Sequence, residues 1–392
     1  MQIASQKKLL LLIFILVSIQ VQAQIKINGV VLDSLTHQPI PDLSILDFQS
    51  NKGTITNENG EFEIIVSALP VKILFSHVSY KKTLKLVISE NLGEIYVPLA
   101  IINLSEAKTE NPALTLLNAA INKVMSDTIN RYPCRAFYQK TSKEGNNSTN
   151  INEIYFDGLW SQLGITKWLP TNARYASKEN SSFKFQNITS SVFYHSGSSS
   201  KNIYLPFSYR NEKNIFNLKI VKFINYGTDD EIAEIICTPK LKENYFFEGV
   251  IYIKTKSDNI VKISGEMHYP NPTPKKIKNP YDTYTINFKE NKNGFSVLDN
   301  LTFIKTITLS GIPDKKIVES AKLIIYEYDN AIDTKNMTSA FVNSDLDLIK
   351  NIPYNLQFWE NNAVIKRSNI EKSLIKSFEN SRGFESNFIN KK

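Results

Sequence analysis

The chain has 392 residues, a net charge of +8 and two cysteines. This length allows two or three domains at about 100–200 residues each. Basic and acidic residues alternate along most of the sequence, whereas a nucleic-acid-binding protein usually concentrates basic residues on one face. We therefore expect no nucleic-acid partner. After residue 23 no apolar run approaches about 20 residues, so no transmembrane segment is expected there.

The first 23 residues have the layout of an export signal. Lys7 and Lys8 precede an apolar run from Leu9 to Ile19, and Val21-Gln22-Ala23 offers small residues before a cleavage point. The apolar run is too short for a spanning helix, although a short membrane anchor is the alternative. Cleavage after Ala23 would leave 369 residues with a net charge of +6. We therefore predict an exported protein, either periplasmic or associated with the outer membrane.

Residues 24–104 predict a small domain of short β-strands. Asn59-Gly60 is typical of a tight hairpin turn, because glycine and asparagine adopt the positive φ angles that such a turn needs. About seven strands at short spacing predict an Ig-like or prealbumin-like antiparallel β-sandwich. The predicted strands are Lys26–Asp33, Leu43–Asp47, Gly53–Thr56, Glu61–Val66, Val71–Ser76, Thr83–Ile88 and Ile95–Leu99. Alternation of apolar residues predicts that the inward side chains are Val30, Leu32, Ile45, Phe62, Ile64, Ile73 and Phe75.

This region resembles the carboxypeptidase regulatory-like domain, a module of bacterial envelope proteins. The residues that carry the resemblance are Gly29-x-x-x-Asp33, Pro39-Ile40, Gly53-Thr54-x-Thr56, Gly60-x-Phe62 and Phe75-Ser76-x-x-x-Tyr80. The sequence departs from the family at His37 and Ser79, where glycine is frequent, and at Asn57, where aspartate is frequent. The resemblance implies no peptidase activity, because the module is a non-catalytic appendage of the enzymes after which it is named.

Residues 105–392 predict a larger β-domain with a helix near 112–127. Pro112 suits a first helical position, and apolar residues then recur at helical spacing. Strands joined mainly by short turns predict an antiparallel curved sheet or half-barrel with flanking helices, and thus a mainly β chain. The predicted strands include Ala136–Lys140, Ile151–Phe156, Phe216–Phe223, Glu231–Cys237, Gly249–Lys254, Ile260–His268, Thr283–Lys289, Leu301–Leu309 and Ala321–Tyr328.

A second helix is predicted near residues 369–380. Ser368-x-x-Glu371 is a capping box, in which each residue caps a backbone N–H group of the other's turn. Apolar residues then fall on one side of the helix. The stretch around Phe358-Trp359, together with this helix, resembles segments of an uncharacterised family of exported proteins.

The sequence lacks the patterns that enzymatic chemistry requires. No histidine has a glutamate three residues later, so the ligand pattern of a zinc carboxypeptidase is missing; the four are His37, His77, His195 and His268. No nucleophile elbow, phosphate-binding loop or dinucleotide fingerprint is present. We therefore expect no enzyme activity, no catalytic residue, no metal site and no cofactor.

Cys134 and Cys237 are the two cysteines. In an oxidising compartment they could form one disulfide, which would close a loop of about 100 residues. The alternative is two buried free thiols, because a bridge needs Cα atoms within about 7 Å and the sequence does not give that distance.

Three functional hypotheses remain open. The first is a non-enzymatic envelope protein whose β-modules bind a protein partner or a surface glycan. The second is a carrier that holds an apolar or lipid-like ligand inside the curved sheet, where aromatic residues are plentiful: Trp160, Trp168, Phe246, Phe247 and Tyr252. The third is a hydrolase with an unrecognised site.

Overall fold

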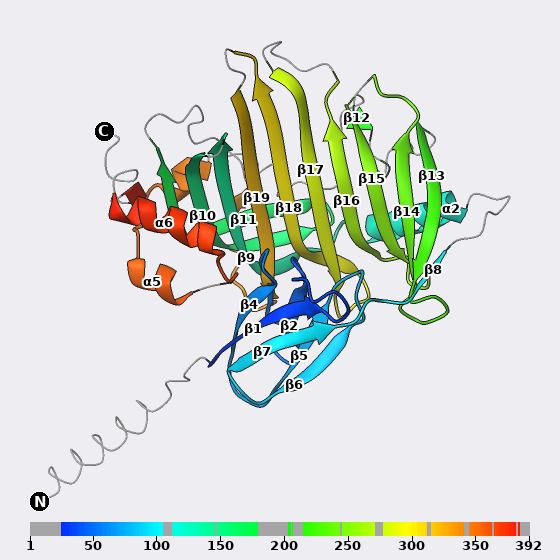
Figure 1. Ribbon diagram of the computed structural model, residues 1–392, viewed down its shortest axis with the longest axis horizontal. Coiled ribbons are helices and arrows are strands. Elements are labelled where there is room, and N and C mark those ends of the chain that lie inside the picture. The colour runs from blue at the N-terminus through cyan, green and yellow to red at the C-terminus, as the bar shows by residue number, and fades with distance from the viewer. Residues whose placement is uncertain are drawn as a thin grey trace, which may run out of the picture.

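The computed structural model is mainly β, with a small sandwich packed against one large open sheet (Figure 1). This architecture confirms the predicted fold class. The structure describes residues 25–104, 112–145, 147–178, 203–204, 206, 215–243, 245–270, 277–311, 315–340, 345–362, 364–381 and 383–384.

Two sheets form the sandwich, with strand orders β4-β1-β7 and β3-β2-β5-β6. Its strands are β1 (Ile25–Asp33), β2 (Ser44–Asp47), β3 (Gly53–Ile55), β4 (Glu61–Val66), β5 (Val71–Ser76), β6 (Thr83–Val87) and β7 (Asn91–Val97). The predicted strands therefore match to within a few residues. One feature differs from an antiparallel sandwich, because β1 and β7 run parallel.

The core of the sandwich confirms five of the seven predicted inward residues. Ile45, Phe62, Ile64, Ile73 and Phe75 all belong to its buried cluster. The predictions for β1, Val30 and Leu32, are wrong, because they lie on the face opposite to the inward one.

On β1 it is Ile27 and Val31 that join this cluster. Val30 is only half-buried, and Leu32 is buried outside the cluster, where it bridges to Pro39. A one-residue shift reverses the face of every side chain on a strand. Because β1 carries apolar side chains on both faces, with Val30 and Leu32 on one and Ile27 and Val31 on the other, alternation alone could not identify the inner one.

The large sheet has the strand order β20-β11-β10-β9-β19-β18-β17-β16-β15-β14-β13-β8, with β12 pairing to β15. Its strands are β8 (Ile102–Leu104), β9 (Tyr132–Glu144), β10 (Asn147–Ser161), β11 (Gly164–Ser177), β12 (Ile203–Tyr204), β13 (Phe216–Ile224), β14 (Ile232–Pro239), β15 (Tyr245–Lys254), β16 (Ile260–His268), β17 (Ile277–Glu290), β18 (Ser296–Leu309), β19 (Lys315–Tyr328) and β20 (Thr338–Ser339). Sequence neighbours pair along most of this order. The exceptions are the pairs β9 with β19, β11 with β20, β8 with β13 and β12 with β15.

Two details of the large sheet go beyond the predicted strands. β11 has no counterpart among them, and most of the others are longer than predicted. Residues 102–104, predicted to close the N-terminal domain, form β8 and pair with β13 at the edge of the large sheet.

One face of the large sheet carries its main core. Helix α2 (Pro112–Ser126) packs there through Leu117 and Ile121. Large side chains fill this face, and four of them are less than 2% exposed: Phe156, Trp160, Trp168 and Phe247. Residues on the same strands that alternate with these, such as Tyr155 beside Phe156, point to the opposite face.

That opposite face, here called the outer face, is covered at one end by the C-terminal segment. Helices α5 (Leu356–Asn361) and α6 (Asn369–Asn380) lie over β9, β10 and β11, whereas the short helix α4 (Asp345–Ile349) contacts β11 (Figure 1). The predicted helix at 369–380 is confirmed, and so is the capping box of Ser368 and Glu371.

The sandwich also lies against the outer face. Lys52 pairs with Glu327 of β19 at 3.4 Å, and Lys82 pairs with Asp230, which precedes β14, at 3.0 Å. The Thr54 hydroxyl donates to the carbonyl oxygen of Val364. Three segments distant in sequence therefore meet at this junction: the sandwich, the large sheet and the C-terminal segment.

Candidate functional site

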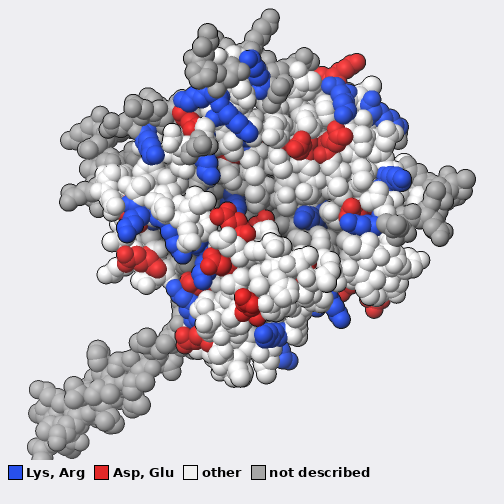
Figure 2. Space-filling model, viewed as in Figure 1, with Lys and Arg blue, Asp and Glu red and all other residues white. Residues whose placement is uncertain are grey.

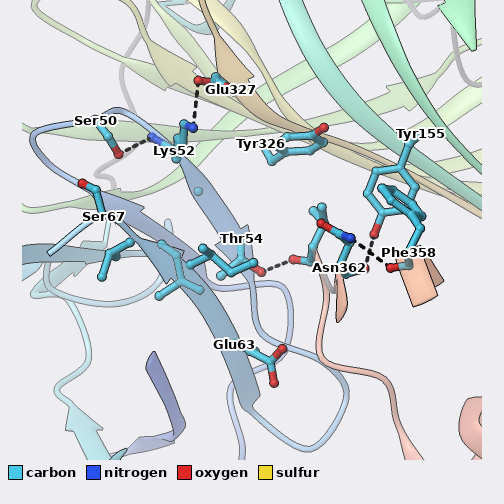
Figure 3. A pocket seen from close by; sticks show the side chains of 15 residues that line it. Ser50, Lys52, Thr54, Glu63, Ser67, Tyr155, Tyr326, Glu327, Phe358 and Asn362 are labelled. Atoms are coloured by element: carbon cyan, nitrogen blue, oxygen red, sulfur yellow. Dashed lines mark hydrogen bonds and ion pairs between the residues drawn. The ribbon is translucent and has the colours of Figure 1, made fainter. Parts of the chain in front are cut away.

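A cavity of about 350 Å³ lies at this junction, and we call it the interdomain cleft (Figure 3). It is bounded by β3 and β4 of the sandwich, by β10 and β19 of the large sheet, and by the segment around α5. Its lining residues are Ser50, Lys52, Gly53, Thr54, Glu63, Ile64, Ile65, Val66, Ser67, Tyr155, Tyr326, Glu327, Phe358, Asn362 and Val364.

One wall of the cleft is a sheet edge. β4 pairs with β1 and ends its sheet. The Val31 N–H donates to the Gly60 oxygen at 2.7 Å, and hydrogen-bonded residues alternate along an antiparallel pair. By this register the backbone groups of Glu61, Glu63 and Ile65 point away from β1. Those of Glu61 are bonded to Asn57, which leaves the groups of Glu63 and Ile65. The cleft is thus lined by an edge whose outward N–H and C=O groups can pair with another extended chain.

The opposite wall is aromatic. Tyr155 contacts Phe358 edge to face, with ring centroids 5.0 Å apart, and lies 6.4 Å from Tyr326. The Tyr155 hydroxyl donates to the Asn362 carbonyl oxygen at 2.7 Å. Burial raises the pKa of both tyrosines well above the ordinary value. They therefore stay neutral and offer flat, mainly apolar surfaces.

The charged groups at the cleft are paired with one another. Arg135 donates to Glu327 at 2.7 Å and lies 3.5 Å from Asp157. The hydrogen bond to Glu327 raises the pKa of Arg135. Lys52 approaches the same Glu327, and Glu63 pairs with a lysine of β1 at 2.9 Å. The cleft consequently favours neutral groups over a strongly charged ligand.

A buried ionic cluster fixes the C-terminal segment that walls the cleft. Glu153 on β10 is fully buried and contacts Arg174 on β11 at 2.6 Å. Arg367 donates to the same carboxylate at 3.0 Å, and Gln139 donates at 2.8 Å. Burial alone would raise the pKa of Glu153, but Arg367 and Arg174 lower it to about 2. The carboxylate is therefore ionised and holds both arginines.

Aromatic rings complete this cluster. The Arg174 guanidinium lies 4.3 Å from the Trp359 ring centroid and 4.9 Å from that of Phe384. Such stacking suits arginine, because its planar charge interacts with the ring face. Phe358-Trp359, noticed in the sequence, thus has two functions in the structure: Phe358 lines the cleft, and Trp359 covers the arginine.

The cysteines lie far from the cleft, in the main core. Both are buried free thiols, Cys134 on β9 and Cys237 on β14. Five strands separate β9 from β14 in the sheet order. Burial raises the pKa of Cys134 to about 12 and that of Cys237 further. The disulfide stays a prediction, and the structure gives neither thiol the character of a nucleophile.

The histidines are dispersed. His37 occupies a turn with a φ of 57°. Burial lowers the pKa of His77 to about 3, so this side chain is neutral. His268 lies 3.2 Å from Glu266, and His195 lies outside the described residues. Among the described residues, no group of three or more His, Cys, Asp or Glu side chains is placed to hold a metal ion.

The cleft itself could not be seen in the sequence. Each wall comes from a different part of the chain. Gly53, Thr54, Ile64 and Phe358 were singled out in the sequence, but none as part of a site. In the part of the chain that the structure describes, no helix is both long and apolar enough to cross a bilayer.

Residues 27–109 match the family model of the CarboxypepD_reg-like domain. This match confirms the resemblance inferred for the N-terminal region, whereas the resemblance around Phe358-Trp359 stays a prediction. No curated protein matches the chain.

Solved structures with partial likeness all have low TM-scores. Lipovitellin, in a structure of its lipid–protein interactions, has 10% identity and a TM-score of 0.24; the match covers 64% of this chain and 30% of the lipovitellin chain. A membrane-associated Bacteroides fragilis protein of unknown function has 10% identity and a TM-score of 0.15, with 78% and 98% covered. MucB in complex with MucA(peri) has 6% identity and a TM-score of 0.18, with 54% and 93% covered. These values carry no argument about function.

Proposed function

We propose that this chain is a non-enzymatic exported envelope protein that binds an extended segment of a partner protein in the interdomain cleft. The observation that carries the proposal is the outward edge of β4, which forms one wall of a 350 Å³ cavity opposite an aromatic wall. Cavities of about 300–1,000 Å³ are typical of ligand sites.

An added strand would use both walls. Its backbone would pair with the outward groups of Glu63 and Ile65, which supplies affinity without sequence specificity. Alternate side chains of the partner would then point toward Tyr155, Tyr326 and Phe358. Since the charges around the cleft are already paired, we expect the partner to present apolar or aromatic side chains there.

The carboxylates near the cleft are paired and the thiols are protonated, which supports binding over catalysis. Glu153, Asp157 and Glu327 all contact arginine side chains. Burial raises the pKa of both thiols, which leaves them protonated at neutral pH. A hydrolytic site needs a base or nucleophile that is free to react, and these groups do not offer one.

The other ligand classes have less support. A surface glycan could stack on the aromatic wall, and the experiment below separates it from a protein. A lipid-like ligand inside the large sheet would have to displace Phe156, Trp160, Trp168 and Phe247, which fill that face.

A site-specific photo-crosslinker tests the proposal. A benzophenone amino acid at Ser67, an exposed residue lining the cleft, should give a protease-sensitive adduct in cells. The same probe at Ile129, which is 83% exposed after α2, serves as the control and should give none. An adduct sensitive to glycosidase but not to protease would refute the protein partner.

A proline on the edge strand sharpens the test. Ile65→Pro removes an outward N–H group without removing a hydrogen bond between β4 and β1, since proline is tolerated on edges. It should abolish the Ser67 adduct, and Ile65→Val should retain it. An adduct that survives Ile65→Pro in a folded protein would show that the partner does not pair with β4.

A further inference from the structure

The strand β6 carries an exposed apolar face that the cleft does not use. Leu84 is 51% exposed, Leu86 is 59% exposed and Ile88, just after the strand, is 76% exposed. Phe48, which follows β2, is 59% exposed. Single exposed apolar residues are ordinary, but a contiguous group of them usually marks an interaction surface.

The strand register shows that these side chains form one group. Leu84 lies opposite Leu74 and Leu86 lies opposite Lys72 across β5 and β6. The Phe48 N–H donates to the Lys72 oxygen at 2.9 Å, which brings Phe48 to the same row. We call Phe48, Leu84, Leu86 and Ile88 the β6 face.

Lysines surround the β6 face. Lys72 and Lys81 are exposed, and neither has an ion-pair partner among the described residues. Lys85 is also exposed, but it alternates with Leu84 and Leu86 and points to the other face of β6. Lys82 is also exposed but pairs with Asp230 at 3.0 Å. Glu90 is the nearby exposed acid in the sequence. The surroundings therefore retain a positive excess. On the lower side of the sandwich, Figure 2 shows basic side chains with acidic ones nearby.

The position of β6 leaves this face open. In its sheet, β6 is the edge opposite β3, which lines the interdomain cleft. Figure 1 places β6 at the lower end of the sandwich. Leu74, which lies opposite Leu84, lines a pocket that residues of the large sheet also line. Phe48, Leu86 and Ile88 do not line this pocket and are exposed. A flat surface could thus contact the β6 face while the cleft stays accessible.

We propose that the β6 face docks this protein onto an anionic lipid surface. Leucine, isoleucine and phenylalanine side chains that protrude from a strand can enter the boundary between head groups and acyl chains. Exposed lysines around them extend their charges toward anionic head groups while their apolar stems lie along the same surface. This positive excess complements an anionic bilayer.

Vesicle flotation tests the proposal with the chain that starts at Gln24, because the apolar leader would itself bind lipid. The protein should float with vesicles that contain phosphatidylglycerol and should bind pure phosphatidylcholine vesicles at least tenfold more weakly. Higher salt should release it, since salt screens exposed charges.

Two matched sets of variants identify the surface. Leu86→Ser with Ile88→Ser should weaken binding to anionic vesicles at least tenfold, and Ile129→Ser with Leu241→Ser, two exposed sites elsewhere, should not. Lys72→Gln with Lys81→Gln should weaken binding by about fivefold per lysine. Lys219→Gln with Lys335→Gln is the charge-matched control at exposed positions elsewhere.

Three results would overturn the proposal. The wild-type protein could stay with the soluble fraction in the presence of anionic vesicles. The β6-face and control variants could float equally well. The wild-type protein could also form a dimer that Leu86→Ser with Ile88→Ser dissociates, without vesicle binding, which would assign the face to a second copy of this chain.

Discussion

The sandwich and the large sheet reach stability in different ways. The sandwich encloses a compact cluster of side chains from residues 25–97, with Phe62 against Phe75 at its centre. The large sheet depends on α2 and on the pairing of β9 with β19, where Glu144 meets Ile317. Contacts within the first region are local, whereas the second is completed only by residues far apart in sequence. The interdomain cleft lies at the junction between these two regions.

The largest difference in stability between the two regions should follow from a substitution in the main core of the large sheet. Trp160 is fully buried and contacts Tyr132 and Tyr328. Trp160→Ala should lower the free energy of unfolding of the large sheet by about 3–5 kcal/mol. Hydrogen exchange should show loss of protection in the large sheet and retained protection in β1 to β7. Equal loss in both regions would show that they unfold as one unit.

The junction should respond to loss of the buried carboxylate. Glu153→Gln leaves Arg174 and Arg367 without their shared partner, which should cost about 3–4 kcal/mol in urea denaturation. Glu248→Gln, which removes an exposed pair with Lys242, is the control and should cost less than about 1 kcal/mol.

The effect of Glu153→Gln on the free energy of unfolding should depend on pH. Because the pKa of Glu153 falls from an ordinary 4.5 to about 2 on folding, its stabilising effect is fully present above about pH 5 and is lost as the pH falls through 2. The difference in stability between the wild-type protein and Glu153→Gln should therefore shrink between pH 5 and pH 2. A difference that grows over this range would contradict the assigned ionisation.

Each region has an Asn-Gly turn, and substitution of the glycine should change stability by a smaller amount. Gly60 has a φ of 71°, and an added Cβ would collide with the backbone oxygen of Val31. Gly294 has a φ of 78°, but its nearest neighbour, a Glu290 carboxylate oxygen, is 4.0 Å away. Gly60→Ala should cost about 2–3 kcal/mol and Gly294→Ala about 1 kcal/mol, measured by chemical denaturation. Equal costs would show that the positive φ angle alone determines both effects and that the collision at Gly60 adds nothing.

The smallest effect concerns the thiols of the large sheet. If Cys134 and Cys237 are free, a reductant should change the free energy of unfolding by less than about 0.5 kcal/mol, whereas a bridge over this loop would contribute about 4–5 kcal/mol. Thiol titration should find two reactive groups per chain after denaturation and none before. A denatured chain without free thiols would establish the disulfide.

Much of the secondary structure could be predicted because its signals are local. β4, β5, β16 and α6 have the bounds that period-two alternation, turn residues and the Ser368 capping box indicated. β11 escaped notice since its buried and exposed positions alternate irregularly around Pro170 and two register shifts. Val30 was misplaced because β1 has apolar residues on both of its faces.

The sequence by itself determined a small sandwich and a succession of antiparallel strands, since each depends on neighbouring residues, whereas the export-type leader stays a prediction. Tertiary structure alone decided that β9 pairs with β19, that Glu153 holds two arginines, and that β4 faces Tyr155 and Phe358 across a cavity. Three of these links, Glu144 with Ile317, Glu153 with Arg367 and β4 with Phe358, join residues separated by about 170 to 300 positions along the chain. Alternation and turn residues specify which side of a strand is apolar, but not which distant strand or helix will cover it.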